Sequence, residues 1–253
     1  MKSNPSVKFR FRTDISKSAL AASVFLLLAA FSGAMASTEP TAQDILKSSQ
    51  KAYDALTSYS DNSAAISNIT GERHEATYTT KLRRPNFYKI EWTGSSQSGP
   101  VNGVCRSDGT ASLLTFGFAN WPQVKPVSRA PDLQTNLGAL VMEGIPVGVD
   151  LPEIFLGEGS NKQAPFVLFS DPRAKAKISR QADEKIDRTD CYVITVLQDL
   201  SGEPNSVRLS IGKQDFLIRQ WREELGETAN TAITVTHRDV SVNPHFSPED
   251  FAH

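Results

Sequence analysis

The stretch KLRRPNFYKIEW, residues 81–92, combines basic residues, a proline and a strand-like alternation. Tyr88, Ile90 and Trp92 fall on one side of an extended chain, because successive side chains of a strand point to opposite faces. Two adjacent arginines stand directly before the proline, where they suit a phosphate clamp, a nucleic-acid contact or a loop anchor. The segment predicts a two-faced strand, and the surrounding sequence must decide what its arginines do.

Most of the remaining chain has the pattern of short strands separated by turns. Runs rich in Thr, Ile, Val and Tyr are typical of strands, and Asp108-Gly109 is a strong hairpin signal. Strands so close together in sequence are expected to pair antiparallel, in one domain. The predicted strands are residues 60–70, 74–82, 87–92, 101–106, 111–118, 166–169, 175–181, 190–198, 205–212, 215–224 and 231–241, with a Gly/Ser-rich loop at 94–100.

Alternation also predicts which side of a strand is dry. One face of 74–82 carries Ala76, Tyr78, Thr80 and Leu82. In 205–212 the dry face carries Val207, Leu209 and Ile211, and the wet face carries Arg208 and Ser210.

Two regions have helical patterns. The first begins at Thr41, with Asp44 in the position of a capping box, and its apolar positions recur at helical spacing as far as Leu56. The second, residues 131–165, is apolar, poor in strand alternation and broken by Pro and Gly. It predicts a helical insertion that lies over the sheet.

The N-terminus has the pattern of a secretory signal peptide. A basic start precedes an apolar run from Ala19 to Phe31 and the small residues Ala34-Met35-Ala36. The run is shorter than the roughly 20 residues of a membrane-spanning helix, although an uncleaved anchor is the alternative. We therefore expect a signal peptide at 1–36 and a soluble, periplasmic domain at 37–253.

Charge argues against a nucleic-acid partner. The whole chain has 27 basic and 28 acidic residues. Removing the five Lys/Arg and one Asp of residues 1–36 leaves 22 and 27, a net charge of −5. A polyanion partner calls for a basic surface.

Both cysteines, Cys105 and Cys191, fall in the exported part. An oxidising compartment permits one disulfide between them. The alternative is a pair of buried free thiols, since cysteine is commonly buried without pairing.

Three segments resemble motifs of the periplasmic lipoprotein-carrier (LolA/LolB-like) superfamily. RRPNFYKIEW (83–92) is similar to its Lys/Arg-Arg-Pro strand, RSDGTASLLTF (106–116) to its Ser-Asp-Gly hairpin, and VNPHFSPEDFAH (242–253) to its closing segment. DCYVITV (190–196) and PEIFL (152–156) look like a subfamily of uncharacterised periplasmic proteins with this fold. The hairpin departs from the family at Thr110, where Lys is usual.

The resemblance implies a mainly β (α+β) fold. A single, strongly curved antiparallel sheet would form an incomplete barrel, with an N-terminal helix and a helical lid over its concave face. Apolar side chains on that face would hold acyl chains.

The resemblance also implies site residues. Arg84 matches the arginine that latches the lid by bonding backbone carbonyls, and the alternative is an ordinary ion pair at the rim. An apolar cavity or rim is expected from Tyr88, Ile90, Trp92, Phe116, Phe118, Trp121, Leu137, Leu140, Ile154 and Phe155, for which plain core packing is the alternative.

No familiar catalytic motif is present in the sequence. His74-Glu75 lacks the second histidine of a zinc motif, and His237, His245 and His253 are expected to face solvent. We therefore expect no catalytic residue, metal or cofactor. The sequence predicts a non-enzymatic carrier or binder of a lipid or acylated lipoprotein, with a membrane-bound donor or acceptor as a further partner. A sensor or protein-interaction module and an exported hydrolase are the alternatives.

Overall fold

The computed structural model describes residues 39–69, 71–96, 99–118, 176–200, 203–225 and 231–252. The chain divides into two units, Met1–Glu39 and Pro40–His253, and every described helix and strand belongs to the second. The expected signal peptide, the helical insertion at 131–165 and the strand at 166–169 lie outside the described residues. No helix among the described residues is both long enough and apolar enough to cross a membrane.

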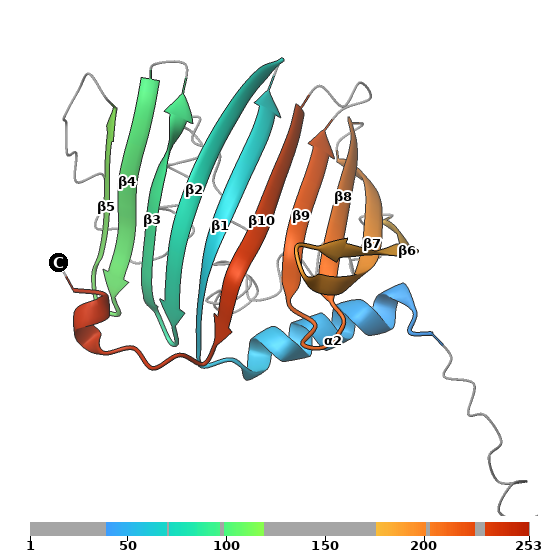
Figure 1. The fold of residues 1–253 in the computed structure, drawn as a ribbon, viewed down its shortest axis with the longest axis horizontal. Coiled ribbons are helices and arrows are strands. Elements are labelled where there is room, and N and C mark those ends of the chain that lie inside the picture. Colours follow the sequence, from blue (N-terminus) through green and yellow to red (C-terminus); the bar gives the residue numbers. More distant parts are fainter. Residues whose placement is uncertain are drawn as a thin grey trace, which may run out of the picture. The chain divides into compact units, whose positions relative to one another are not determined.

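The described part forms one open antiparallel sheet of ten strands (Figure 1). The strand order is β5-β4-β3-β2-β1-β10-β9-β8-β7-β6, so two five-stranded meanders meet where β1 pairs with β10. The mainly β fold with an N-terminal helix, predicted from the sequence, is confirmed. The strands are β1 (Ser58–Ile69), β2 (Glu72–Arg83), β3 (Phe87–Ser96), β4 (Gly99–Asp108), β5 (Ser112–Phe118), β6 (Lys177–Ile186), β7 (Thr189–Leu200), β8 (Glu203–Gly212), β9 (Ile218–Leu225) and β10 (Thr231–Val242).

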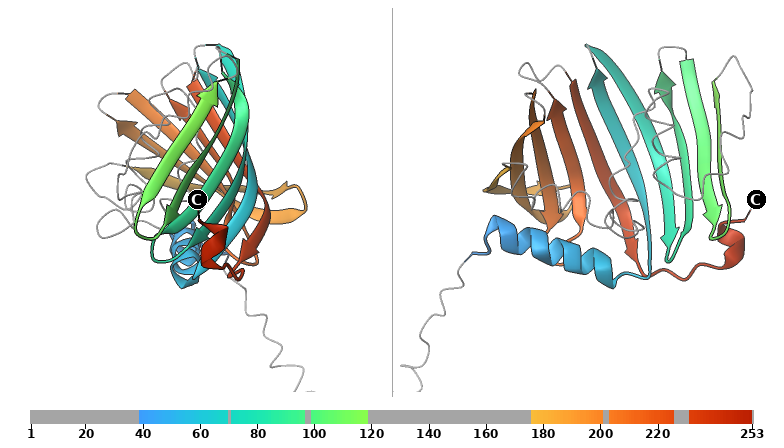
Figure 2. Two further views of the ribbon diagram at one scale, coloured as in Figure 1. Left: turned by 90° about the vertical axis from the view of Figure 1, so that its left-hand side faces the viewer. Right: turned by 180° about the vertical axis from the view of Figure 1, so that it is seen from behind.

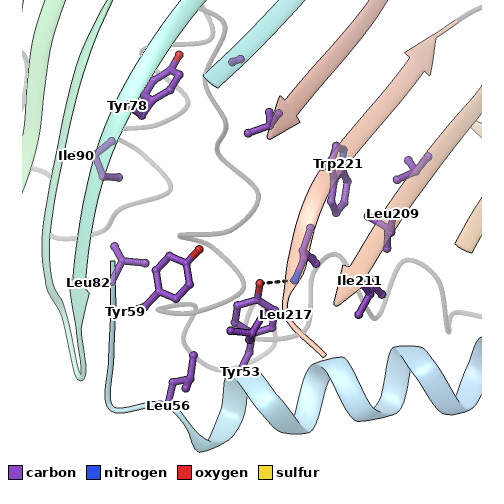
Figure 3. Packing of buried hydrophobic residues seen from close by; sticks show 14 of the residues in the cluster. Tyr53, Leu56, Tyr59, Tyr78, Leu82, Ile90, Leu209, Ile211, Leu217 and Trp221 are labelled. Carbon is purple, nitrogen blue, oxygen red and sulfur yellow. Dashed lines mark hydrogen bonds between the residues drawn. The ribbon is translucent and has the colours of Figure 1, made fainter. Parts of the chain in front are cut away.

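Helix α2 (Ala42–Ala55) runs across the ends of the strands of the second meander (Figures 1 and 2). The predicted capping box is present, because Thr41 Oγ1 accepts from Asp44 N and Asp44 Oδ2 accepts from Thr41 N, both at 3.2 Å. The Tyr53 hydroxyl accepts a hydrogen bond of 3.0 Å from Ile218 N, which Figure 3 shows as a dashed line. This bond fixes the C-terminal half of α2 to the start of β9.

The core lies on one side of the sheet, which we call the inner face. There, α2 packs against side chains from both meanders, and Figure 3 shows Tyr59 between Leu82 of β2 and Tyr53 of α2. The faces predicted for β2 and β3 are confirmed by the burial of Ala76, Tyr78, Thr80, Leu82, Tyr88, Ile90 and Trp92.

Several predicted boundaries and faces need correction. The segment 94–100, predicted as a loop, is largely strand, because β3 continues to Ser96 and β4 begins at Gly99. β9 begins at Ile218, since the preceding turn holds Phe216 at a φ of 57°. Ser210 was expected on a wet face, yet it is buried and donates a hydrogen bond to Glu184.

The two cysteines are free and buried. Six strands lie between β4, which carries Cys105, and β7, which carries Cys191, so seven spacings of about 4.8 Å place them roughly 34 Å apart along the sheet. A disulfide needs Cα atoms within about 7 Å. The disulfide is therefore wrong, and the alternative of two buried thiols holds. Burial raises the pKa of the Cys105 thiol to about 12.

The C-terminal segment, residues 243–252, leaves β10 and packs on the outer face, opposite the core. Phe251 is fully buried there against Phe87 and Phe246, with ring centroids 5.6 and 5.5 Å away. Arg83 donates a 2.7 Å hydrogen bond to the Phe246 carbonyl and lies over the Phe87 ring. The closing motif of the sequence thus holds the second meander to the first.

Candidate ligand-binding face

The centre of the inner face is a strip of small side chains on β1. Ser63, Ala65 and Ser67 are all buried and alternate along the strand. Ser63 lies opposite Tyr78 of β2, which lies opposite Trp92 of β3. On the other side, Ala65 lies opposite Val235 of β10, which lies opposite Trp221 of β9. Large aromatic side chains therefore stand two strands away on both sides of the strip.

A polar cluster, Tyr59, Asp61 and His237, lies on the same face at the junction of the two meanders. Asp61 Oδ2 accepts from the Tyr59 hydroxyl at 3.1 Å and lies 2.5 Å from His237 Nδ1. The β1–β10 register shifts between Ser60 and Asn62, beside Asp61. Alternation along β1 gives Asp61 the same face as Tyr59 and Ser63.

The polar cluster is unusual for its burial. Asp61 and His237 are 4% and 5% exposed, and they are the one acid and the one histidine among the buried side chains that the structure describes. Buried ionisable groups are rare unless paired, because a charge loses its hydration in an apolar surrounding. Burial, and then the nearby Asp61 charge, raise the pKa of Tyr59 well above its usual range, so Tyr59 remains a neutral donor.

Some polar atoms on this face have no hydrogen-bond partner among the described contacts. They include Asp61 Oδ1, Ser67 Oγ, Tyr78 Oη and Trp92 Nε1, each buried. Most buried polar atoms in proteins are hydrogen-bonded, and an unpaired one costs about 1–3 kcal/mol. The inner face therefore carries four buried polar atoms that have no partner among the described contacts.

The outer face carries a different feature over the same strands. A hollow of about 390 Å³ is lined by residues of β1, β2, β3 and β10; Thr77, Thr79, Glu91, Thr93 and Arg238 are among them, and so are Ser63, Tyr78 and Trp92. Thr77, Thr79, Glu91 and Thr93 alternate along their strands with the inner-face residues, so most of the lining belongs to the outer side of the sheet.

The structure describes only some of the residues predicted to line the cavity. Tyr88, Ile90 and Trp92 lie on the inner face, as expected, and are buried. Phe116 and Phe118 belong to β5, whose backbone is described there without these side chains. The other predicted residues lie outside the described part of the chain: Trp121, Leu137, Leu140, Ile154 and Phe155.

Arg84 does bond backbone carbonyls at the end of a helix, and the helix is α2. Its Nε donates to the Leu56 carbonyl at 3.0 Å, and its Nη2 donates to the Tyr53 carbonyl at 3.2 Å. The backbone N–H of Arg84 also donates to the Thr57 carbonyl at 3.0 Å. The predicted lid at 131–165 lies outside the described residues, so the latch on that segment stays a proposal.

The expectation that His237 faces solvent is wrong. It is buried because its partner, Asp61, lies 176 residues earlier and is brought beside it only by the β1–β10 pairing. One sequence signal was available, since Asp61 shares the dry face of its strand with Tyr59. His245 is exposed as expected, and His253 is outside the described residues.

Comparison with known proteins finds likeness only among solved structures. No protein-family model matches the chain, and no curated protein matches it. MucB of Pseudomonas aeruginosa, solved in complex with MucA, is 9% identical; the match covers 84% of this chain and 60% of that chain, with a TM-score of 0.46. LprF from Mycobacterium bovis is 12% identical over 81% of this chain and 94% of that chain, with a TM-score of 0.46. The LolA superfamily protein NE2245 from Nitrosomonas europaea is 12% identical over 85% of this chain and 98% of that chain, with a TM-score of 0.34.

This chain spans about 60% of the length of the MucB chain. At identities of 9–12%, the likeness concerns the fold.

Proposed function

We propose that this chain is an exported binding protein whose inner face holds the acyl chain of a lipid or an acylated protein. The observation that carries the proposal is the strip of small side chains, Ser63, Ala65 and Ser67, between large aromatic side chains on a dry face. Small residues keep the sheet surface low along β1, while the aromatic side chains rise on both sides. A flexible apolar chain fits such a surface.

The binding energy would come from burial. Each CH₂ group removed from water contributes roughly 0.8 kcal/mol, so a chain of a dozen carbons can bind without a specific polar contact. A carrier built this way exchanges its cargo with a membrane-bound donor or acceptor. The basic, then apolar, N-terminal sequence supports export to the periplasm. The proposal contains no catalytic step.

Two neighbouring alanines provide a matched test. Ala65 is fully buried on the inner face, whereas Ala64 is half-buried on the outer face. Ala65→Leu adds bulk to the strip, and Ala64→Leu adds the same bulk to the opposite side of the same strand. We expect Ala65→Leu to weaken binding of methyl laurate about tenfold or more, the loss of roughly two buried CH₂ groups, and Ala64→Leu to leave it unchanged.

Binding is measured by displacement of the fluorescent dye ANS, and native mass spectrometry of protein from its own exported compartment identifies any bound lipid. Denaturant unfolding of both variants shows that Ala65→Leu remains folded. Wild-type protein that binds neither dye nor methyl laurate and carries no lipid would contradict the proposal and favour a protein-interaction module.

A further inference from the structure

One oxygen of the Asp61 carboxylate, Oδ1, makes no hydrogen bond within the described part of the fold. Oδ2 is engaged twice, by Tyr59 and His237. Oδ1 is buried and has no hydrogen-bond partner among the described contacts. A carboxylate oxygen is a strong acceptor that loses hydration when buried, so leaving it unbonded is costly. Its position on the dry face beside the small-residue strip places this unmet acceptor next to the proposed ligand.

We propose that the polar cluster, Tyr59, Asp61 and His237, binds the head group of an amphipathic lipid through an O–H or N–H donor on that head group, bonded to Asp61 Oδ1. This inference rests on the proposed function and specifies its ligand class. An oxygen with only lone pairs repels the unprotonated oxygens of a fatty carboxylate or a phosphate. It accepts from a hydroxyl or an amine, and a bond with a charged acceptor is stronger than one between neutral groups.

The surrounding residues suit a head group with more than one hydroxyl. Ser63 lies opposite His237 in the sheet and opposite Tyr78 on its other side. The Tyr78 hydroxyl is buried without a partner among the described contacts, and a hydroxyl can both donate and accept. A glycerol head group could therefore donate to Asp61 and exchange a second bond with Tyr78.

The same geometry gives the ligand a direction. One step further along β1, Ala65 lies opposite Val235, which lies opposite Trp221, and all three are buried. This row is apolar except for the indole nitrogen. An acyl chain attached to a head group at Asp61 would lie against it, so the polar and apolar ends of the ligand meet matching parts of one face.

Two esters with the same acyl chain test the proposal. 1-Monolauroylglycerol carries two free hydroxyls, and methyl laurate carries none. In ANS displacement, wild-type protein should bind monolauroylglycerol about tenfold more tightly, which is about 1.4 kcal/mol. Dodecylamine and dodecanol, in a second pair, show whether the ammonium or the hydroxyl is the better donor.

The decisive variant is Asp61→Leu/His237→Phe, which replaces the buried pair with apolar side chains of similar size. Such replacements often leave stability unchanged or improve it, so the fold should persist. The variant should bind methyl laurate as well as the wild type does, or better, and lose its preference for monolauroylglycerol. Asp239→Asn is the matched control, because it removes an exposed carboxylate from the outer side of the same strand pair.

The outcomes separate the two proposals. Equal binding of both esters by wild-type protein overturns the head-group site and leaves acyl-chain binding standing. Binding of neither ester overturns both. A preference that survives in the double variant also overturns the assignment to Asp61. Release of laurate from either ester overturns it as well, because the protein would then be a hydrolase and not a binding protein.

Discussion

Arg84 supplies what the C-terminal end of α2 lacks. The last turn of α2 contains no basic residue, and the final carbonyls of a helix carry partial negative charge without intrahelical donors. Arg84 follows the end of β2 and donates to the Tyr53 and Leu56 carbonyls. Its guanidinium is half-buried; burial lowers its pKa, and the nearby Asp54 charge opposes that shift. The guanidinium therefore fastens the helix to the sheet.

Replacing Arg84 with leucine should loosen α2 in particular. Arg84→Leu removes two hydrogen bonds from a charged donor, and we expect a loss of about 1–3 kcal/mol in the free energy of unfolding. Amide exchange within Ala42–Ala55 should accelerate, because local opening of the helix becomes easier. Hydrogen–deuterium exchange with mass spectrometry measures both the helix and the remaining segments.

Arg83→Leu is the control for this prediction. Its guanidinium lies on the outer face and bonds the Phe246 carbonyl, so its loss should accelerate exchange in residues 243–252 and spare α2. If both variants changed the exchange of α2 equally, Arg84 would have no special part in holding the helix. Faster exchange in 131–156 in Arg84→Leu alone would support the latch on the predicted lid.

At the scale of single residues, sequence reasoning succeeded where the cause is local. Strand alternation alone predicts that Tyr88, Ile90 and Trp92 share one face of β3, and all three are buried. Asp61 and His237 were missed because their contact depends on the pairing of the first strand with the last. Arg84 was expected to bond carbonyls of the lid; the carbonyls that it bonds among the described residues belong to α2.

At the scale of elements, strands were located well and their ends less so. Polarity alternation runs through β2 and β8, so their existence could be predicted within about two residues of each end. Gly and Ser in 94–100 favoured a loop, yet the β3–β4 pairing extends to Ser96 opposite Gly99. Cross-strand hydrogen bonds there outweigh the weak strand preference of glycine.

The bulge in β6 creates an ionic group that alternation did not predict. The β6–β7 register shifts between Gln181 and Glu184. Glu184 bonds Ser210 and Arg208, with Arg208 Nη2 at 2.7 Å. Burial acts to raise the pKa of Glu184, but these bonds outweigh it and hold the pKa below its ordinary value of 4.5. Ser210, on the face of β8 that was expected to be solvent-exposed, is therefore buried beneath Glu184.

This ionic group should make stability depend on acid. Because the pKa of Glu184 is lower in the folded state, its contribution is complete above the ordinary value of 4.5 and is lost as the pH falls through the folded pKa. We expect Glu184→Gln to cost about 1 kcal/mol at pH 7 and to flatten the loss of stability below about pH 4.5. Urea unfolding at pH 7, 5, 4 and 3 measures both effects.

Glu75→Gln is the comparison for this prediction, since Glu75 pairs with Arg73 in an exposed position. An exposed ion pair contributes little, so this variant should follow the wild type at every pH. Parallel acid curves for Glu184→Gln and the wild type would show that the bulge contributes nothing to acid sensitivity.

At the scale of the whole molecule, the two meanders are joined side by side. Hairpin signals predicted pairing within each meander, because each strand follows its neighbour closely in sequence. The β1–β10 pairing, from Tyr59 opposite Val242 to Asn68 opposite Ala232, joins the two ends of the domain and has no local signal. The polar cluster and the small-residue strip both lie at this junction, so the proposed site exists only when the meanders are joined.

The C-terminal segment is a second connection between the meanders, and removing its main contact should weaken the whole domain. It leaves β10, bonds Lys81 of β2 through Asp250 at 2.7 Å, and buries Phe251 completely against Phe87. Truncating a buried phenylalanine typically costs 3–5 kcal/mol, so Phe251→Ala should lower the free energy of unfolding by about 3 kcal/mol. Urea unfolding followed by far-ultraviolet circular dichroism measures this loss.

His245→Ala, an exposed change in the same segment, should stay within about 0.5 kcal/mol of the wild type. The lost contact joins the meanders, so Phe251→Ala should also shift unfolding at a probe in each one. Trp92 reports on the first meander and Trp221 on the second, in variants that retain only that tryptophan. Equal shifts at both probes are expected, since β1 and β10 remain paired and the sheet unfolds as one cooperative unit. A shift confined to Trp92 would mean that the segment stabilises its own meander only and that the junction at β1 and β10 holds the domain together without it.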